Sequence, residues 1–278
     1  MTELNPISRK LYIWVNQLLY IGTSPEPHRE HLVVSDKLIV SLQGVINIVK
    51  DNGDEISTRT CLVKAGADFK KSTVNANNSV LAIYYLAPLT QDYPALRSIM
   101  SYARGGVHYG HPEEDLLIKT LLTIRDRSIK PDQSYDMLRK FIIQPYLAHC
   151  IFKEFDPRIV EVVHQIRTTV SENLSLQKFA QDVHLSESRL EKLFKDQVGV
   201  PITRYRLRYR VFMGIIHLAT GQSITEAALA SGFASSSHFS KSFSTINGVS
   251  PSAAFFKPPF LHVLIDDEIL DELCLVQL

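Results

Sequence analysis

Polar side chains gather on one side of a helix that the sequence predicts after Ser186. Ser is a favoured residue at the first position of a helix, where its hydroxyl accepts a backbone hydrogen bond. Leu190, Leu193 and Phe194 recur at the spacing of a buried face. The other positions therefore point elsewhere and offer hydrogen-bond donors and acceptors; they are Ser188, Arg189, Glu191, Lys192 and Lys195. Taken singly, such charges are equally typical of a solvated helix face.

The stretch around these side chains is one of two similar copies, which lie about fifty residues apart. They cover about residues 175–199 and 223–248. In each copy a Ser begins a short helix with a small Ala, and a turn leads to a second helix with apolar residues four apart. This pattern is that of a helix-turn-helix, and its repetition indicates a duplicated structural unit.

The second copy closely resembles the second DNA-binding half of the AraC/XylS transcription regulators. The similarity is strongest from Ser223 to Phe243 and in the sequence Asn-Gly-Val-Ser-Pro-Ser that begins at Asn247. It extends over roughly residues 156–257 and includes both copies and the segment between them. The resemblance implies a cytoplasmic regulator that binds double-stranded DNA, with no enzymatic activity and no cofactor. It leaves open whether the protein is an activator or a repressor.

The second helix of a helix-turn-helix enters the major groove, where Arg and Lys donate to guanine and Glu accepts from cytosine. Position by position, the resemblance assigns base contacts to Ser188, Glu191 and Lys192, with Arg189 beside them. In the second copy, the positions that match the groove-facing residues are Ser236, Ser237, Ser240 and Lys241. Arg210 stands where the family has its usual basic residue, so the resemblance also assigns it to DNA binding.

A long helix is predicted from Pro201 to about Thr220, between the two copies. About nineteen residues at 1.5 Å each span roughly 28 Å, which approaches the ~34 Å of one DNA turn. One chain can therefore present two recognition helices to the same side of a duplex. Gly214 replaces the usual Ala of the family. It either loosens the helix by about 1 kcal/mol or allows a neighbouring element to come closer.

The N-terminal half is predicted to be a small β-barrel or sandwich. The clearest strands begin at Leu38, Val45, Thr58 and Val80. This region resembles the cupin-type sensor domain that precedes many AraC-type domains, so a small, partly apolar effector is expected, although its binding residues are unknown. The fold class is α+β with two domains: residues 1–150 form the cupin-like domain with its following helices, and residues 156–260 form the all-α domain.

Metal binding by the N-terminal half rests on few residues. Catalytic cupins hold metals through a His-x-His pair, which this sequence lacks. His28 and His31 are weak metal candidates, and with His108 and His111 they make two His-x-x-His pairs that suit zinc. Hydrogen-bonded or solvent-facing histidines are the alternative.

Two helices are predicted after the barrel. Leu116, Leu117, Thr120, Leu121 and Ile124 are expected to share one face of the first helix, which begins near Pro112. Tyr135, Leu138, Ile142 and Ile143 are expected to point inward from the second, which begins near Pro131. The family often pairs two subunits through such a helix, so these helices make a homodimer or cover their own barrel.

Charge is distributed unevenly along the chain, although its formal net charge is only +1. Residues 156–260 carry 12 basic and 8 acidic side chains, whereas residues 261–278 carry 5 acidic and no basic ones. The acidic, apolar tail of residues 261–278 is either a packed extension or a segment that docks on the basic domain or on another protein. An odd number of cysteines, three, favours a reducing compartment, and no membrane segment is evident.

The leading hypothesis is therefore a DNA-binding transcription regulator controlled by an effector or by oligomerisation, which works with RNA polymerase. Two alternatives remain open. One is a metal-dependent cupin-type enzyme, which the missing ligand pattern disfavours. The other is a protein-interaction adaptor with weak DNA binding, which the Ser-rich second recognition helix suggests.

Overall fold

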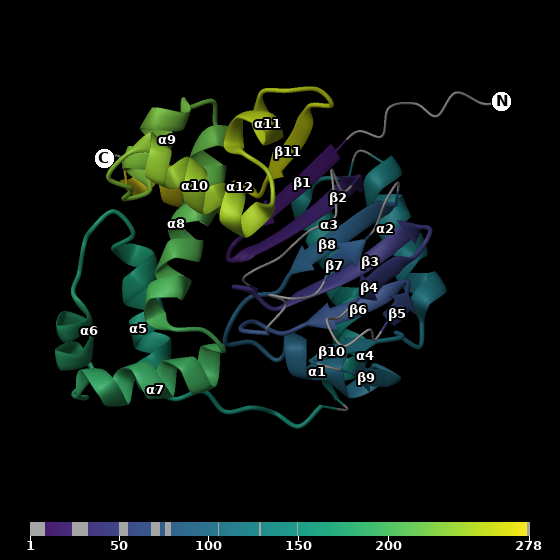
Figure 1. Cartoon of the computed structure of the whole chain (residues 1–278), viewed down its shortest axis with the longest axis horizontal. Coiled ribbons are helices and arrows are strands. Elements are labelled where there is room, and N and C mark those ends of the chain that lie inside the picture. The colour runs from purple at the N-terminus through teal and green to yellow at the C-terminus, as the bar shows by residue number, and fades with distance from the viewer. Residues whose placement is uncertain are drawn as a thin grey trace. The chain divides into compact units, whose positions relative to one another are not determined.

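The computed structural model describes residues 9–23, 33–49, 55–67, 73–75, 79–104, 106–127, 129–148 and 150–276, with 73–75 and 272–276 by their backbone alone (Figure 1). The chain forms two compact units. The sheet unit comprises Met1–Phe152 and Lys257–Leu278, and the helical unit comprises Lys153–Phe256. The α+β prediction, with an N-terminal sheet domain and a C-terminal helical region, is confirmed.

The described part of the sheet unit holds an eight-stranded and a three-stranded sheet. The larger sheet has the order β11-β1-β2-β8-β3-β6-β10-β9 and the smaller one β5-β4-β7. The larger sheet contains β1 (Arg9–Trp14), β2 (Gln17–Thr23), β3 (Lys37–Gln43), β6 (Thr60–Val63), β8 (Val80–Tyr85), β9 (Tyr102–Arg104), β10 (Val107–Tyr109) and β11 (Leu261–Ile265). The smaller one contains β4 (Ile46–Val49), β5 (Glu55–Thr58) and β7 (Thr73–Asn75). The four strands expected near Leu38, Val45, Thr58 and Val80 are present.

Helices of the sheet unit bury their apolar sides in its main core. They are α1 (Asp92–Ile99), α2 (Glu114–Asp126), α3 (Pro131–Leu138), a π-helical turn (Arg139–Ile143) and α4 (Gln144–Leu147). The core holds Leu117, Leu121 and Ile124 of α2 together with strand residues such as Leu38. The apolar stripe of α2 thus covers its own sheet, which is one of the two expected uses of this helix.

Two details of these helices differ from the expected faces or refine them. Leu116 was expected inward but is 42% exposed, whereas Ile118 is buried. Successive residues of an α-helix are rotated by about 100° around its axis. The buried face of α2 is therefore turned from the Leu116 side toward Ile118, and Leu121 lies nearer its centre than predicted. Ile142 and Ile143, both in the π-helical turn, are both buried.

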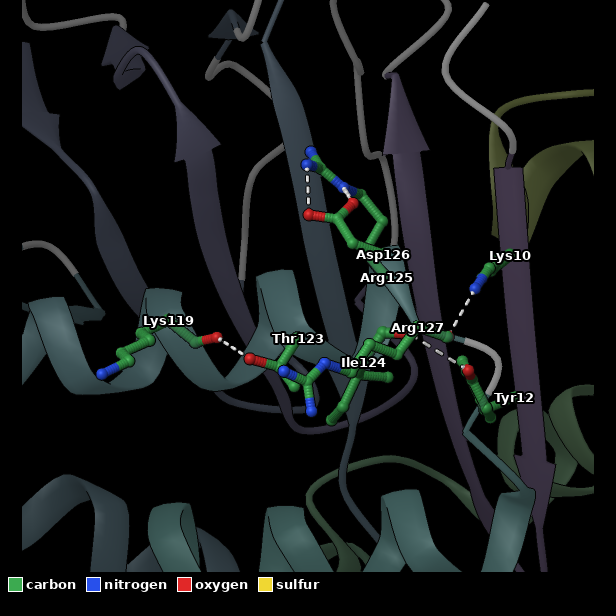
Figure 2. Close-up of polar contacts among 8 residues, drawn as sticks. All are labelled: Lys10, Tyr12, Lys119, Thr123, Ile124, Arg125, Asp126 and Arg127. Atoms are coloured by element: carbon green, nitrogen blue, oxygen red, sulfur yellow. Dashed lines mark hydrogen bonds and ion pairs between the residues drawn. The ribbon is translucent and has the colours of Figure 1, made fainter. Parts of the chain in front are cut away.

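Side chains of β1 bind the C-terminal end of α2 (Figure 2). The Tyr12 hydroxyl donates to the Ile124 carbonyl oxygen at 3.2 Å, and Lys10 Nζ donates to the Arg127 carbonyl oxygen at 3.0 Å. These carbonyls have no partner within the helix, and a cation is favourable at this end of its dipole. Burial lowers the pKa of the Lys10 ammonium, while Asp126 raises it. The contacts fix the C-terminal end of α2 against β1.

The helical unit consists of two helix pairs on either side of a long helix. Its elements are α5 (Pro157–Thr168), α6 (Leu176–Asp182), α7 (Glu187–Val198), α8 (Ile202–Ala219), α9 (Ile224–Ala230), α10 (Ser236–Asn247) and α11 (Pro251–Phe255). Ser175, Ser186 and Ser223 cap α6, α7 and α9, as the sequence predicts. Asp156 caps α5 by accepting a hydrogen bond from the Arg158 amide. Among the described residues, no helix has the length and hydropathy needed to span a membrane.

The C-terminal tail returns to the sheet unit and is a packed extension. Strand β11 lies parallel to β1, with Arg9 opposite Leu261 and Ile13 opposite Ile265. The Asp266 amide donates to the Ile13 carbonyl oxygen at 3.0 Å just before α12 (Asp267–Val276). The tail therefore covers an edge of β1 that would otherwise present unpaired backbone groups.

A substitution in α12 tests this packing. Ile269 is 4% exposed, so Ile269→Ala should lower the free energy of unfolding by about 2–4 kcal/mol through lost burial and a residual cavity. Urea denaturation followed by circular dichroism measures the loss. His262→Ala, at an exposed position of β11, is the matched control and should change stability by less than about 0.5 kcal/mol. Equal stability of both variants would contradict the packed tail.

Candidate nucleic-acid interface

Helix α7 presents a polar face to solvent. Its N-cap, Ser186, accepts a hydrogen bond from the Arg189 amide at 3.3 Å. Leu190 and Phe194 are fully buried, and this fixes the orientation of the helix about its own axis. The predicted site residues of this helix are all exposed; they are Ser188, Arg189, Glu191, Lys192 and Lys195. The structure thus brings all five together, and none of them faces inward.

Helix α10 offers a smaller polar surface. Ser235 caps it by accepting from the His238 amide at 3.2 Å, and Phe239 and Phe243 are buried. Of the predicted residues, Ser237 and Lys241 are exposed, whereas Ser236 and Ser240 are half-buried. This helix therefore exposes hydroxyls and a single cation of the predicted set.

His238 is an exposed residue of α10 that the sequence analysis did not single out. Its ring stands edge-on to Phe233 with 5.2 Å between the ring centroids, which limits its freedom. In a neutral imidazole one ring nitrogen donates a hydrogen bond and the other accepts one. His238 therefore adds a polar group beside Ser237. The sequence could have indicated this residue, because His238 directly follows the serines that begin α10 and therefore lies in the first turn of the helix.

Arg210 makes contacts within the protein. On α8, its Nε donates to the Val170 carbonyl oxygen at 3.1 Å, and its Nη2 donates at 3.0 Å to the Glu172 carbonyl oxygen and to Asn173 Oδ1. Burial lowers the pKa of its guanidinium, which keeps its charge because the ordinary value lies above 12. The predicted DNA-contact residue Arg210 therefore uses these donors within the protein, on the segment between α5 and α6.

Helix α8 packs against both recognition helices. At its N-terminal end the Tyr205 ring lies 5.6 Å from the Phe194 ring of α7. Further along, a Cβ on Gly214 would come within 2.7 Å of Phe239 Cζ, so the Phe239 ring rests directly on the α8 backbone. Of the two roles open to Gly214, the structure favours close approach. Figure 1 shows α7 and α10 toward opposite ends of α8.

An acidic side chain, that of Asp156, lies near the start of the helical unit. Asp156 caps α5, and hydrogen bonds from Arg158 lower the pKa of its carboxyl to about 2, to which the charge of Arg189 adds a smaller effect. Asp156 therefore stays ionised at neutral pH. Its negative charge therefore lies close enough to interact with the guanidinium of Arg189 on α7.

No metal site emerges in the described part of the chain, where no three His, Cys, Asp or Glu side chains gather as ligands would. The weak candidates His28 and His31 lie outside the described residues. His111 is buried, and its Nδ1 accepts a hydrogen bond from the Glu113 amide at 3.0 Å.

Residues 179–255 match the model of a helix-turn-helix domain family. The transcriptional regulator GbdR of Pseudomonas aeruginosa is 32% identical over 96 residues, which are 34% of this chain and 26% of that protein. The regulator ArgR of the same species is 29% identical over 96 residues, or 34% of this chain and 29% of ArgR. The chain thus spans between a quarter and a third of the length of these curated relatives.

The chain contains an AraC-type helix-turn-helix domain. The matched residues hold both recognition helices, so the resemblance drawn from the sequence is confirmed for this half.

Most of the chain also resembles ToxT of Vibrio cholerae in fold. The apo form of a ToxT point variant covers 86% of this chain and 96% of ToxT at a TM-score of 0.58 and 17% identity. A form of ToxT bound to an unsaturated fatty acid covers 91% of this chain and 96% of ToxT, with a TM-score of 0.53 and 18% identity. At such identities the likeness concerns the fold, here a sheet domain followed by an AraC-type domain.

Gly214→Ala tests the contact between α8 and α10. Alanine favours a helix by about 1 kcal/mol over glycine, but here its Cβ would collide with the buried Phe239 ring. We expect the collision to dominate and the free energy of unfolding to fall by about 1–3 kcal/mol. Thermal or urea denaturation measures it.

Two variants serve as controls for this prediction. Thr203→Ala, at an exposed position of α8, should leave stability nearly unchanged. Adding Phe239→Leu to Gly214→Ala should recover part of the loss, because the smaller side chain relieves the overlap. A stabilised single Gly214→Ala variant would contradict the close approach.

Proposed function

We propose that this protein is a sequence-specific DNA-binding transcription regulator that acts in the cytoplasm without catalysis. The observation that carries the proposal is the exposed polar face of α7, which a buried pair, Leu190 and Phe194, orients outward. In a helix-turn-helix such a face enters the major groove. Helix α10 repeats the arrangement at the other end of α8.

The side chains of α7 suit direct base recognition. Lys192 and Arg189 donate hydrogen bonds to acceptors such as guanine O6 and N7, and Glu191 accepts from cytosine N4. Ser188 can serve either base type, and Lys195, one turn further along, suits a phosphate. On α10 we assign Ser236, Ser237, Ser240 and Lys241 mainly to phosphates and groove shape, because few bidentate side chains are present.

Substitution of Lys192 tests the assignment. Lys192→Ala should weaken binding to a duplex selected in vitro with the wild-type chain by about 1–3 kcal/mol and relax the preference at one base pair. The matched comparison is Lys195→Ala, which should weaken binding almost equally on all sequences and reduce the salt dependence by about one counterion. Fluorescence anisotropy across salt concentrations and base substitutions measures both.

Three outcomes distinguish the candidate functions. Uniform weakening of all sequences by Lys192→Ala would contradict base recognition by this residue. Absence of wild-type binding to any selected duplex at low salt would contradict the regulator itself and favour a protein-interaction adaptor. Stoichiometric iron or zinc in protein purified without a tag would favour the metal-dependent cupin-type enzyme.

We further propose that a small, partly apolar effector controls the protein through the sheet unit. Support comes from the fold shared with ToxT, which has been solved with an unsaturated fatty acid bound. Two partners complete the proposal: a second copy of the chain and RNA polymerase. Because the apolar stripe of α2 is buried in its own core, a homodimer has to use other surfaces.

Oleate, an unsaturated fatty acid, is the first effector to test. At saturating but sub-micellar concentration it should change the DNA dissociation constant of the full chain at least about fivefold, the lower end of ordinary coupling between two sites. Calorimetry without DNA checks binding itself. Absence of both heat and an affinity change would remove this ligand class, and the DNA-binding proposal would stand.

A further inference from the structure

The loop of residues 169–174, which joins α5 to α6, is held by two arginines of α8. Arg206 Nη1 donates to the Leu174 carbonyl oxygen at 2.8 Å, and its Nη2 donates to the Glu172 carbonyl oxygen at 3.3 Å. Arg210 binds carbonyl oxygens of the same loop, as described above. The arginines lie four residues apart and therefore project from the same side of the helix. Together they connect α8 to the entrance of the first helix-turn-helix.

Arg206 also contacts the core of the first helix-turn-helix. Its guanidinium carbon lies 5.3 Å from the centroid of the Phe179 ring, which is 1% exposed in α6. Burial lowers the pKa of Arg206, and the neighbouring charge of Arg210 lowers it further. Two like charges tolerate this proximity because loop carbonyls accept their hydrogen bonds. Donors occupied in this way are not available to a DNA phosphate.

The turn of the second helix-turn-helix touches the same loop. Gly232, between α9 and α10, has a φ of +76°, and a Cβ there would lie 2.6 Å from the Val170 carbonyl oxygen and 3.1 Å from Arg210 Nε. A side chain is therefore excluded by the very carbonyl that Arg210 binds. Loop 169–174 is thus a shared contact of the first helix-turn-helix, α8 and the second helix-turn-helix.

We infer that Arg206, Arg210 and Gly232 are positioning residues that set the orientation of α7 relative to α10 through loop 169–174. The inference rests on the proposed DNA-binding function and deepens it: the junction determines which spacing of two half-sites one chain accepts. Arg210, predicted from the sequence to bind DNA, is thereby assigned a positioning role within the protein.

The physical reason is multivalency. Once α7 is bound, α10 meets its own groove segment at an effective concentration that depends on how rigidly the two are connected. A rigid junction gives high affinity at one spacing and a steep loss at others. A loosened junction lowers affinity at the best spacing and makes the other spacings more nearly equal.

The first experiment measures spacing. Dissociation constants are compared on the selected duplex and on versions with one, two or five base pairs inserted between the half-sites. We expect Arg210→Ala and Arg206→Ala to bind the uninterrupted duplex about tenfold more weakly than the wild type. The penalty for insertions should also be much smaller in these variants. Arg204→Ala removes the same charge from an exposed position of α8 and should keep the wild-type spacing profile.

Salt dependence separates positioning from phosphate binding. Arg210→Ala should leave the slope of log affinity against log salt unchanged, whereas loss of a phosphate contact would reduce it by about 0.9. Arg210→Lys keeps the charge without the planar fork, so we expect it to retain the flattened spacing profile. A reduced slope in Arg210→Ala, or full rescue by Arg210→Lys, would overturn the inference.

A measurement without DNA makes the inference independent of the proposed function. Nitroxide labels are placed at the exposed positions Asp196 of α7 and Thr245 of α10, in a full chain with Cys150→Ser and Cys274→Ser. Pulsed electron resonance should give a narrow distance distribution, broadened by Arg210→Ala or Arg206→Ala at unchanged helix content. Unchanged distributions would refute the junction. If the variants broaden the distance distribution but the wild-type chain binds no DNA, the junction stands and only the proposed function is refuted.

Discussion

The helical unit depends on a single helix that must be buried along two different sides. Near its start, α8 contributes Ile202 and Tyr205 to the core that contains Phe194 of α7. Its last two turns are buried almost all around, from Val211 to Leu218, and receive Phe239 of α10 on Gly214. A helix that is apolar on several sides is stable only between packed partners. Neither helix-turn-helix can therefore detach from α8 without exposing core residues.

Local chemistry made much of this unit predictable from the sequence. Serine caps need only the residue and the helix that follows it, and Ser175, Ser186 and Ser223 all cap as expected. The buried positions of α7 follow from a spacing of four, so its exposed face could be assigned residue by residue. Strands β3, β4 and β8 were also recognisable from local sequence, because each is a short, largely apolar run between turn residues.

Features that depend on distant parts of the chain were not predictable. Strand β1 is buried at every position from Lys10 to Trp14, so no alternation marks it as a strand, and its partner β11 lies about 250 residues further on. Leu116 and Ile118 are equally apolar, and only the packing of α2 decides which is buried. Arg210 illustrates the same limit at the site, since its sequence context cannot distinguish a guanidinium that binds carbonyls from one that binds phosphates.

The two recognition helices are chemically unequal, and this makes the junction between them more important. Of the predicted site residues, α7 exposes two lysines, an arginine, a glutamate and a serine, whereas α10 exposes one lysine and one serine and has its other two serines half-buried. A helix that binds mainly phosphates and groove shape contributes little sequence specificity alone. Connected rigidly to α7, however, it is delivered to a defined groove segment, and its weak contacts then depend on spacing. In the proposed complex with DNA, the geometry of α8 and loop 169–174 therefore supplies the specificity that the side chains of α10 lack.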